Sequence, residues 1–142
     1  MEPKKIFLNG LLLPLFLVAA SASAEVVVIV SASSAITRLT HEQVTRIFLG
    51  KTDTFPNGSH VVPIDQSEGN AARDEFYSKV AKKNSSQLAA YWAKIIFTGD
   101  GRPPNLLGSN VAVRNAVADN PNVIGYIDKS AVDSSVRVIL EP

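Results

Sequence analysis

The feature that most constrains the fold of this chain is an uninterrupted β-branched run at residues 26–30, Val-Val-Val-Ile-Val. β-Branched side chains favour extended backbone. A run with no alternating polar residues is typical of a strand that is buried on both faces. Residues 25–31 are therefore predicted to form an interior strand of a sheet.

Helix signals and further strand signals alternate along the rest of the chain. Thr40 with Gln43, and Asn84 with Gln87, match the capping box that opens a helix. The predicted helices are residues 40–50, 70–80, 84–99 and 111–118, and the further predicted strands are residues 60–64, 123–127 and 136–140. The alternation predicts an α/β sandwich whose sheet is mostly parallel and flanked by helices.

Apolar spacing predicts which faces of these elements are buried. The predicted buried residues are Val44, Ile47 and Phe48 in helix 40–50, Leu88, Tyr91, Trp92, Ile95 and Ile96 in helix 84–99, and Val136, Val138 and Leu140 on one face of strand 136–140.

The first 24 residues have the pattern of a cleavable signal peptide. Lys4 and Lys5 form a basic segment, residues 6–20 are almost entirely apolar, and Ala22-Ser23-Ala24 matches a cleavage site. The alternative is a membrane anchor, but the apolar run is shorter than the roughly 20 residues that a spanning helix needs. We predict export to the periplasm, with residues 25–142 as one domain.

Composition excludes several function classes. Without residues 1–24, the basic and acidic residues number 12 each, so the domain is formally neutral. A neutral domain lacks the basic surface that nucleic acid or an anionic membrane requires. The chain contains no cysteine, so packing alone must stabilise it in an oxidising compartment.

Residues 61–77 form the clearest candidate site, in which a short strand runs through a polar turn directly into a helix. Gly69 lets the backbone approach a ligand, and Ser67 and Asn70 can donate hydrogen bonds. The backbone N–H groups and the positive end of the helix dipole favour an anion there. Arg73 lies in the first turns of that helix, where it can reach back to a bound anion.

The acidic residues around this turn support a second interpretation of Arg73. It can pair with Asp65, Asp74 or Glu75 at the surface, where an ion pair contributes little. Glu68 and the same carboxylates would also repel an anion.

A second group of candidates follows the first strand. Ser31, Ser33 and Ser34 would lie at the carboxyl edge of a parallel sheet, where open α/β folds bind ligands, although serines in a loop are also common turn residues. Thr98-Gly99 and Gly125-Tyr126 are further candidates for the same crevice. Gly125 is equally explained by close packing and Tyr126 by burial in the core.

The sequence contains no recognisable catalytic or metal-binding set. It has no cysteine, no G-x-S-x-G motif, and only two histidines, His41 and His60, neither with a second ligand at a typical metal-site spacing. We predict a protein that is not an enzyme and that uses no cofactor or metal.

Three segments resemble the periplasmic phosphate-binding proteins that serve ABC importers. Residues 39–51 resemble their helix followed by F-x-G-K, and Asn-Pro-Asn-Val-Ile-Gly-Tyr-Ile at 120–127 resembles their pGAIGY strand. Residues 66–70 lie where that family has an R-S-D-G-S-G-T phosphate loop. The order and spacing match over roughly residues 25–140, with small single-lobe members as the most similar group.

The resemblance implies a single lobe of a type II periplasmic-binding-protein fold, similar to the second of the family's two lobes. The loop departs from the family pattern. The arginine position falls on Gln66, the serine on Asn70, and the glycine and threonine on Ala71 and Ala72.

The function that the resemblance implies is capture of phosphate or a related oxyanion for an ABC importer, with a permease as partner and a homodimer as one way to complete the cleft. The expected anion-binding residues are Ser31, Ser33, Gln66, Ser67, Gly69, Asn70 and Arg73. The alternative is a lobe without ligand that docks onto a membrane sensor or transporter.

Overall fold

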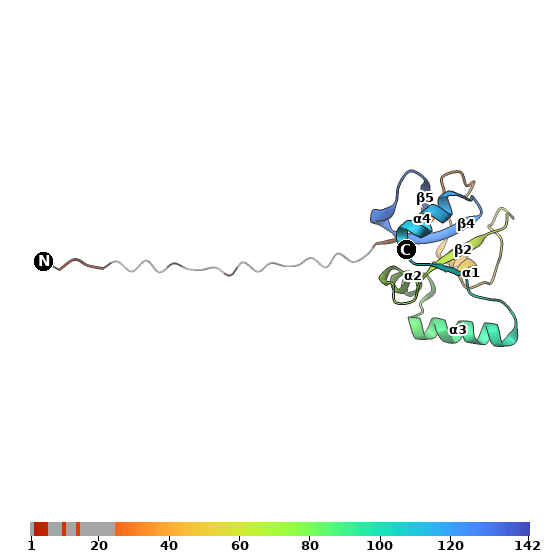
Figure 1. Ribbon diagram of the computed structural model, residues 1–142, viewed down its shortest axis with the longest axis horizontal. Helices are drawn as coiled ribbons and strands as arrows, with labels where there is room; N and C mark the ends of the chain where they lie inside the picture. Colours follow the sequence, from red (N-terminus) through yellow and green to blue (C-terminus); the bar gives the residue numbers. More distant parts are fainter. Residues whose placement is uncertain (1, 6–9, 11–13, 15–24) are drawn as a thin grey trace.

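The computed structural model describes residues 2–5, 10, 14 and 25–142. Most of the predicted signal peptide lies outside these residues, so the leader stays a prediction. The elements are β1 (Val26–Ser31), α1 (His41–Phe48), β2 (Val62–Gln66), α2 (Ala71–Ala81), α3 (Ser85–Thr98), β3 (Asn105–Leu107), α4 (Asn110–Ala118), β4 (Val123–Asp128), the 3-10 turn η1 (Lys129–Ala131) and β5 (Val136–Leu140). The strands form a single five-stranded sheet (Figure 1).

The sheet is mixed, which corrects the prediction of a mostly parallel one. The strand order is β3-β2-β4-β1-β5. β2 is parallel to β3 and β4, but β1 is antiparallel to both β4 and β5. A continuous apolar run shows that a strand is buried without showing its direction, so the sequence pattern could not reveal the reversal of β1.

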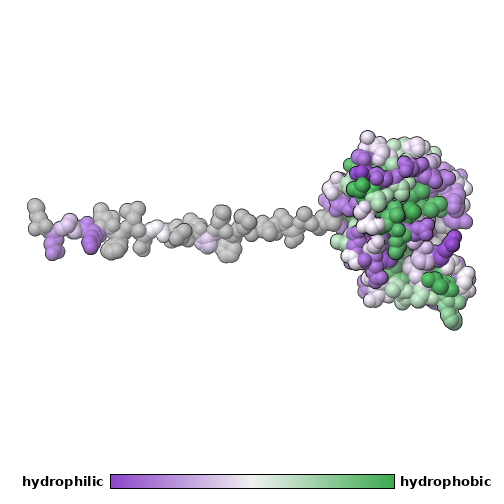
Figure 2. All heavy atoms as spheres, viewed as in Figure 1, coloured by the Kyte–Doolittle hydropathy of each residue, from purple (hydrophilic) through white to green (hydrophobic). Residues whose placement is uncertain are grey.

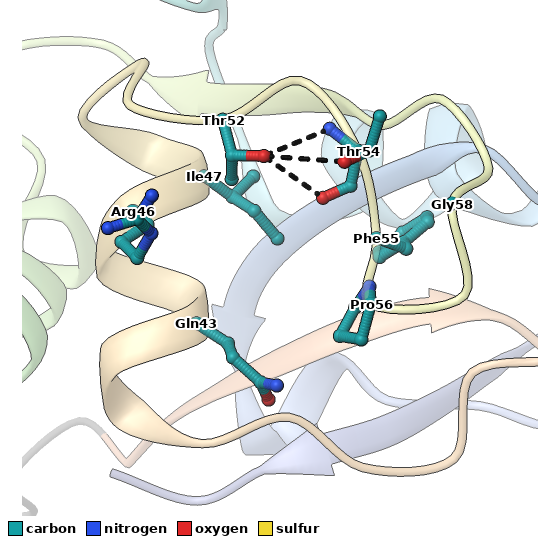
Figure 3. A pocket seen from close by; sticks show the side chains of 8 residues that line it. All are labelled: Gln43, Arg46, Ile47, Thr52, Thr54, Phe55, Pro56 and Gly58. Atoms are coloured by element: carbon teal, nitrogen blue, oxygen red, sulfur yellow. Dashed lines mark hydrogen bonds between the residues drawn. The ribbon is translucent and has the colours of Figure 1, made fainter.

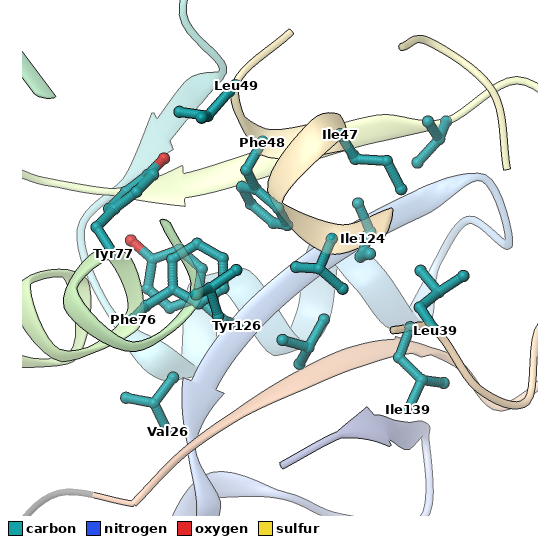
Figure 4. Packing of buried hydrophobic residues seen from close by; sticks show 14 of the residues in the cluster. Val26, Leu39, Ile47, Phe48, Leu49, Phe76, Tyr77, Ile124, Tyr126 and Ile139 are labelled. Atoms are coloured by element: carbon teal, nitrogen blue, oxygen red, sulfur yellow. The ribbon is translucent and has the colours of Figure 1, made fainter. Parts of the chain in front are cut away.

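The two faces of β1 enter two separate hydrophobic clusters, which confirms that this strand is buried on both sides. Val26, Val28 and Val30 belong to a cluster with residues of α1, α2 and α3. Figure 4 shows Val26 together with Phe48 of α1 and Phe76 of α2 in this cluster. Val27 and Ile29 pack with α4 on the other face. The sheet is therefore covered by α1 and α2 on one side and by α4 on the other.

Local sequence signals fix where the helices begin. Thr40 caps α1, and Asn84 caps α3, each with the reciprocal glutamine contact of a capping box. Val44, Ile47 and Phe48 are buried in α1, as predicted. These features are confirmed because a capping box needs only residues three apart along the chain.

Helix α3 departs from the predicted burial pattern. Leu88 and Trp92 are buried, Tyr91 and Ile95 are only partly so, and Ile96 is 57% exposed. Phe97, next to it, is 92% exposed, and the corresponding end of the helix forms an apolar patch (Figure 2). α3 lies along the margin of the domain rather than under the sheet (Figure 1), so its apolar stripe is longer than the surface available to cover it.

Two strand details also differ from the prediction. Val28 pairs with Leu140 but Ile29 pairs with Val138, so β5 holds one extra residue, Ile139. This bulge moves Leu140 to the opposite face from Val136 and Val138. β2 ends at Gln66, two residues later than predicted, which places Asp65 in a strand rather than a turn.

Gly125 permits the close approach of α4 to β4, which decides between the two interpretations of this glycine. A Cβ at this position would lie 2.6 Å from Val113 Cγ1 and 3.1 Å from Val117 Cγ2. We expect Gly125→Ala to lower the free energy of unfolding by about 1–3 kcal/mol, the usual cost of overpacking. Urea denaturation measures this loss.

The matched control is Gly108→Ala, because a Cβ there meets no atom within 4 Å. Its unfolding midpoint should stay close to that of the unchanged protein. Equal effects of the two substitutions would contradict the packing role of Gly125.

Candidate functional site

The predicted anion loop lies between β2 and α2. The Asn70 side chain caps α2 by accepting the Ala72 N–H at 3.0 Å, and the Ser67 carbonyl accepts the Asn70 N–H at 3.2 Å. Gly69 has φ +86°, a left-handed conformation that favours glycine. Ser67 and Gly69 are exposed. The loop is therefore a fixed turn at the positive end of an eleven-residue helix.

A buried carboxylate, Asp65, lies beneath this loop at 1% exposure. It accepts hydrogen bonds from the Tyr126 hydroxyl, from the Tyr77 hydroxyl at 2.6 Å and from the Gln66 N–H at 2.7 Å. The Arg73 Nε lies 3.5 Å from its Oδ1. Three donors and one cation thus compensate a charge that would otherwise be costly to bury.

The two tyrosines of this cluster are held protonated. Burial first, and then the adjacent Asp65 carboxylate, raise the pKa of Tyr77 and the pKa of Tyr126 well above the ordinary value. The Tyr126 ring also stacks on Phe76, with ring centroids 4.0 Å apart (Figure 4). Tyr126 is therefore a core residue and a hydrogen-bond donor to Asp65, not a residue that lines a crevice.

Gln66 forms its hydrogen bonds inside the protein, so it is not available to bind an anion as predicted. Its side chain is fully buried, and its Nε2 donates to the Tyr126 carbonyl and to Asn110 Oδ1, both at 2.9 Å. Its backbone N–H donates to Asp65 and Tyr126. The sequence analysis placed Gln66 in the loop after strand 60–64, but β2 continues through this position.

Arg73 pairs with Asp65, as the second interpretation of the sequence anticipated. The pair is buried rather than at the surface, since the two side chains are 13% and 2% exposed. The guanidinium also lies 5.5 Å from the centre of the Tyr77 ring. Its charge is therefore shared with a carboxylate before any ligand arrives.

Ser31 and Ser33 do not join this loop. β1 is antiparallel to β4, whereas β2 is parallel to β4, so the end of β1 lies at the opposite edge of the sheet from the end of β2. The Ser31 hydroxyl donates to the Ala118 carbonyl at 3.1 Å and lies 2.9 Å from the Ser33 hydroxyl. The prediction that these serines share the site is wrong because it assumed a parallel β1.

A hollow of about 200 Å³ opens beside Arg73, between the loop and α3, and we call it the Arg73 hollow. Its lining residues are Asp65, Glu68, Arg73, Ser85, Ala89, Trp92, Pro103, Pro104 and Leu106. A hollow of about 340 Å³ between α1 and residues 52–58 is remote from the loop (Figure 3), and its Arg46 is exposed. The Arg73 hollow is the one that the candidate loop opens into.

Three residues of this site were missed by the sequence analysis in their present roles. Asp65 was considered only as a surface partner of Arg73, Tyr77 was not considered, and Trp92 was expected only in the core. Their signal in the sequence is weak, since a tyrosine four residues after an arginine and twelve residues after an aspartate is not a motif. Only the fold brings them together.

Other chemistry is not apparent in the part of the chain that the structure describes. His41 and His60 are exposed. Among the described residues, no three potential metal ligands of the His, Cys, Asp or Glu types lie close enough to hold an ion. In the same residues, no helix combines the length and the apolarity that crossing a membrane requires.

Comparison with known proteins identifies the architecture. No protein-family model and no curated sequence matches the chain. Solved structures do match, among them a putative phosphate ABC transporter substrate-binding protein from Clostridium perfringens with bound phosphate, at 21% identity and TM-score 0.63. An ABC-type phosphate transport receptor from Vibrio cholerae matches at 20% identity and TM-score 0.64, and PstS from Borrelia burgdorferi at 15% and 0.61.

The fold is that of a single lobe of a periplasmic binding protein. Each alignment covers 81% of this chain but only 44–46% of the matched structure. The chain therefore spans less than half the length of those proteins. The predicted fold class is confirmed, apart from the direction of β1, while identities of this size leave the ligand of the lobe open to proposal.

Proposed function

We propose that this chain is an exported, non-enzymatic solute-binding lobe that takes phosphate or a related oxyanion at the loop before α2, in connection with an ABC importer. The observation that carries the proposal is Arg73, a largely buried cation that lines a hollow at the positive end of α2. The fold supports it, because structures of this architecture are described as phosphate-binding proteins, one of them with phosphate bound.

The loop retains donors that an anion can use. Within the described residues, the backbone N–H groups of Glu68, Gly69 and Ala71 have no acceptor. Backbone N–H groups at a helix start, together with a guanidinium, are a common setting for an oxyanion. These donors remain although Gln66 and the Asn70 side-chain oxygen are engaged elsewhere.

We expect the affinity of the isolated lobe to be modest. Arg73 is already paired with Asp65, and the exposed Glu68 carboxylate repels an anion. One open wall also leaves the ligand largely in water, where each charged contact contributes only about 1 kcal/mol. A second copy of the chain or a membrane partner would supply the other wall and raise the affinity.

Isothermal titration of residues 25–142 with phosphate and sulfate tests the proposal. Saturable binding is expected, and Arg73→Gln should weaken it about fivefold, the equivalent of about 1 kcal/mol, because it removes the one cation that lines the hollow. Arg38→Gln is the matched control, since Arg38 is exposed and lies beside β5, far from the loop. Absence of saturable binding with both anions would contradict the proposal.

The alternative is a ligand-free lobe that docks onto a membrane sensor or transporter. The observation that favours it is the exposed apolar end of α3, where Ile96 and Phe97 are 57% and 92% exposed. Under this alternative, Phe97→Ser should abolish binding to the membrane partner while the anion titrations stay flat. Anion binding that is unaffected by Phe97→Ser favours the solute-binding lobe instead.

A further inference from the structure

The walls of the Arg73 hollow are mostly apolar. Ala89 and Trp92 of α3 form one side, and Pro103, Pro104 and Leu106 form another. Leu106 is 51% exposed, so this wall is open to an incoming ligand. An inorganic oxyanion makes no favourable contact with such surfaces, whereas each buried apolar carbon of an organic ligand does.

The charges around the hollow favour a single negative charge over two. Arg73 and Asp65 form a neutral pair, and Glu68 adds a negative charge at the rim. A doubly charged phosphate therefore faces only one cation that is already compensated. A carboxylate carries one charge, and its two oxygens match the planar fork of a guanidinium.

Trp92 Nε1, a buried donor of a lining residue, has no hydrogen-bond acceptor among the described residues. Arg73 Nε makes only the ion-pair contact with Asp65 at 3.5 Å and no hydrogen bond. Trp92 is only 7% exposed, so water does not satisfy its N–H freely. A buried donor without a partner costs free energy, and a ligand oxygen placed nearby can recover part of it.

The volume of the hollow indicates how much of a ligand it can hold. Its volume of about 200 Å³ equals that of roughly seven water molecules at about 30 Å³ each. This is room for about seven non-hydrogen atoms, as in a five-carbon branched carboxylate such as isovalerate.

We propose that the Arg73 hollow binds a small organic carboxylate with a short apolar tail, with the carboxylate on Arg73 and the tail between Trp92 and Leu106. The inference rests on the proposed function, because it names the ligand class of the same loop. It differs in predicting that affinity grows with the apolar part of the ligand.

Fluorescence titration provides a local readout, because Trp92 is the only tryptophan of the chain. The probes are acetate, butyrate, isovalerate, isovaleramide and inorganic phosphate. Affinity should rise about fourfold for each added methylene that leaves water, hence roughly 60-fold from acetate to isovalerate. The neutral isovaleramide, of the same shape, should bind about fivefold more weakly than isovalerate, because it lacks the charged contact of about 1 kcal/mol.

Two variants separate the tail from the charge. Leu106→Asn should weaken isovalerate about tenfold and leave phosphate binding unchanged, whereas Arg73→Gln should weaken both. Val111→Asn is the control, since Val111 on α4 is 50% exposed, as Leu106 is, but lies outside the hollow. Thermal melts of all variants verify that they fold.

The outcomes distinguish this inference from the proposed function. Phosphate binding with equal or absent affinity for acetate and isovalerate overturns the inference and leaves the proposed function intact. Failure of every anion overturns both. Equal affinity for isovalerate and isovaleramide overturns the role of charge and thus the inference. Carboxylate binding without phosphate binding supports the inference and removes phosphate from the proposed function.

Discussion

Asp65→Asn should lower the free energy of unfolding by about 3–5 kcal/mol, the cost of removing one partner of a buried ion pair. The substitution leaves the largely buried Arg73 guanidinium without its carboxylate. The Tyr77 and Tyr126 hydroxyls, which both donate to Asp65, would compete for one neutral carbonyl oxygen. Urea denaturation of the two proteins measures the difference.

Asp74→Asn is the matched control, because Asp74 is an exposed carboxylate in the first turn of the same helix. Its loss should cost less than about 1 kcal/mol, the contribution of a charge near a helix end. The double variant Asp65→Asn/Arg73→Gln should be less destabilised than the sum of its single variants, since it leaves no unpaired charge. Additive effects would contradict the pairing.

Alkaline pH should unfold this protein steeply. Burial and Asp65 raise the pKa of Tyr77 and the pKa of Tyr126, so both keep their protons in the folded state when an unfolded tyrosine has lost its own near pH ~10. The folded state then binds more protons than the unfolded state, and stability falls as pH rises. The contribution is complete below that pH and decreases by about 1.4 kcal/mol per pH unit for each tyrosine above it.

Urea denaturation between about pH 9 and pH 11 tests this slope, together with the ultraviolet absorbance of tyrosinate. Tyr126→Phe should roughly halve the decrease in unfolding free energy per pH unit, because only Tyr77 then keeps a proton that the unfolded state has lost. Native protein whose tyrosines all ionise near the ordinary pKa of about 10, without unfolding, would contradict the prediction.

The predictable parts of the fold are those that depend only on residues close together in the sequence. Thr40 and Asn84 cap helices because the residues that complete each cap follow three positions later. The burial of β1 is likewise predicted from neighbouring residues alone, because its apolar run is continuous. The direction of β1 depends on its pairing with β4 and β5, distant segments that a local pattern does not encode.

The position of the candidate site was predictable from the sequence, but most of its hydrogen bonds were not. The glycine turn and its helix start were located from the sequence, and the pairing of Arg73 with Asp65 was one of the anticipated alternatives. Asp65 was expected at the surface, where polar residues usually lie, and Gln66 was expected to contact an anion from the loop. Both residues are buried instead, and because buried polar atoms need partners inside the protein, their side chains bind neighbouring residues.

Under the proposed function, the ion pair between Arg73 and Asp65 makes Asp65 an internal competitor for the anion. Any ligand carboxylate or phosphate must share the guanidinium with an aspartate that cannot diffuse away, so binding becomes a partial exchange rather than a simple addition. The same ion pair that lowers the affinity for an anion also stabilises the site when no ligand is bound. Without a ligand, Asp65 still compensates the Arg73 charge, so the largely buried guanidinium does not depend on an anion for a partner.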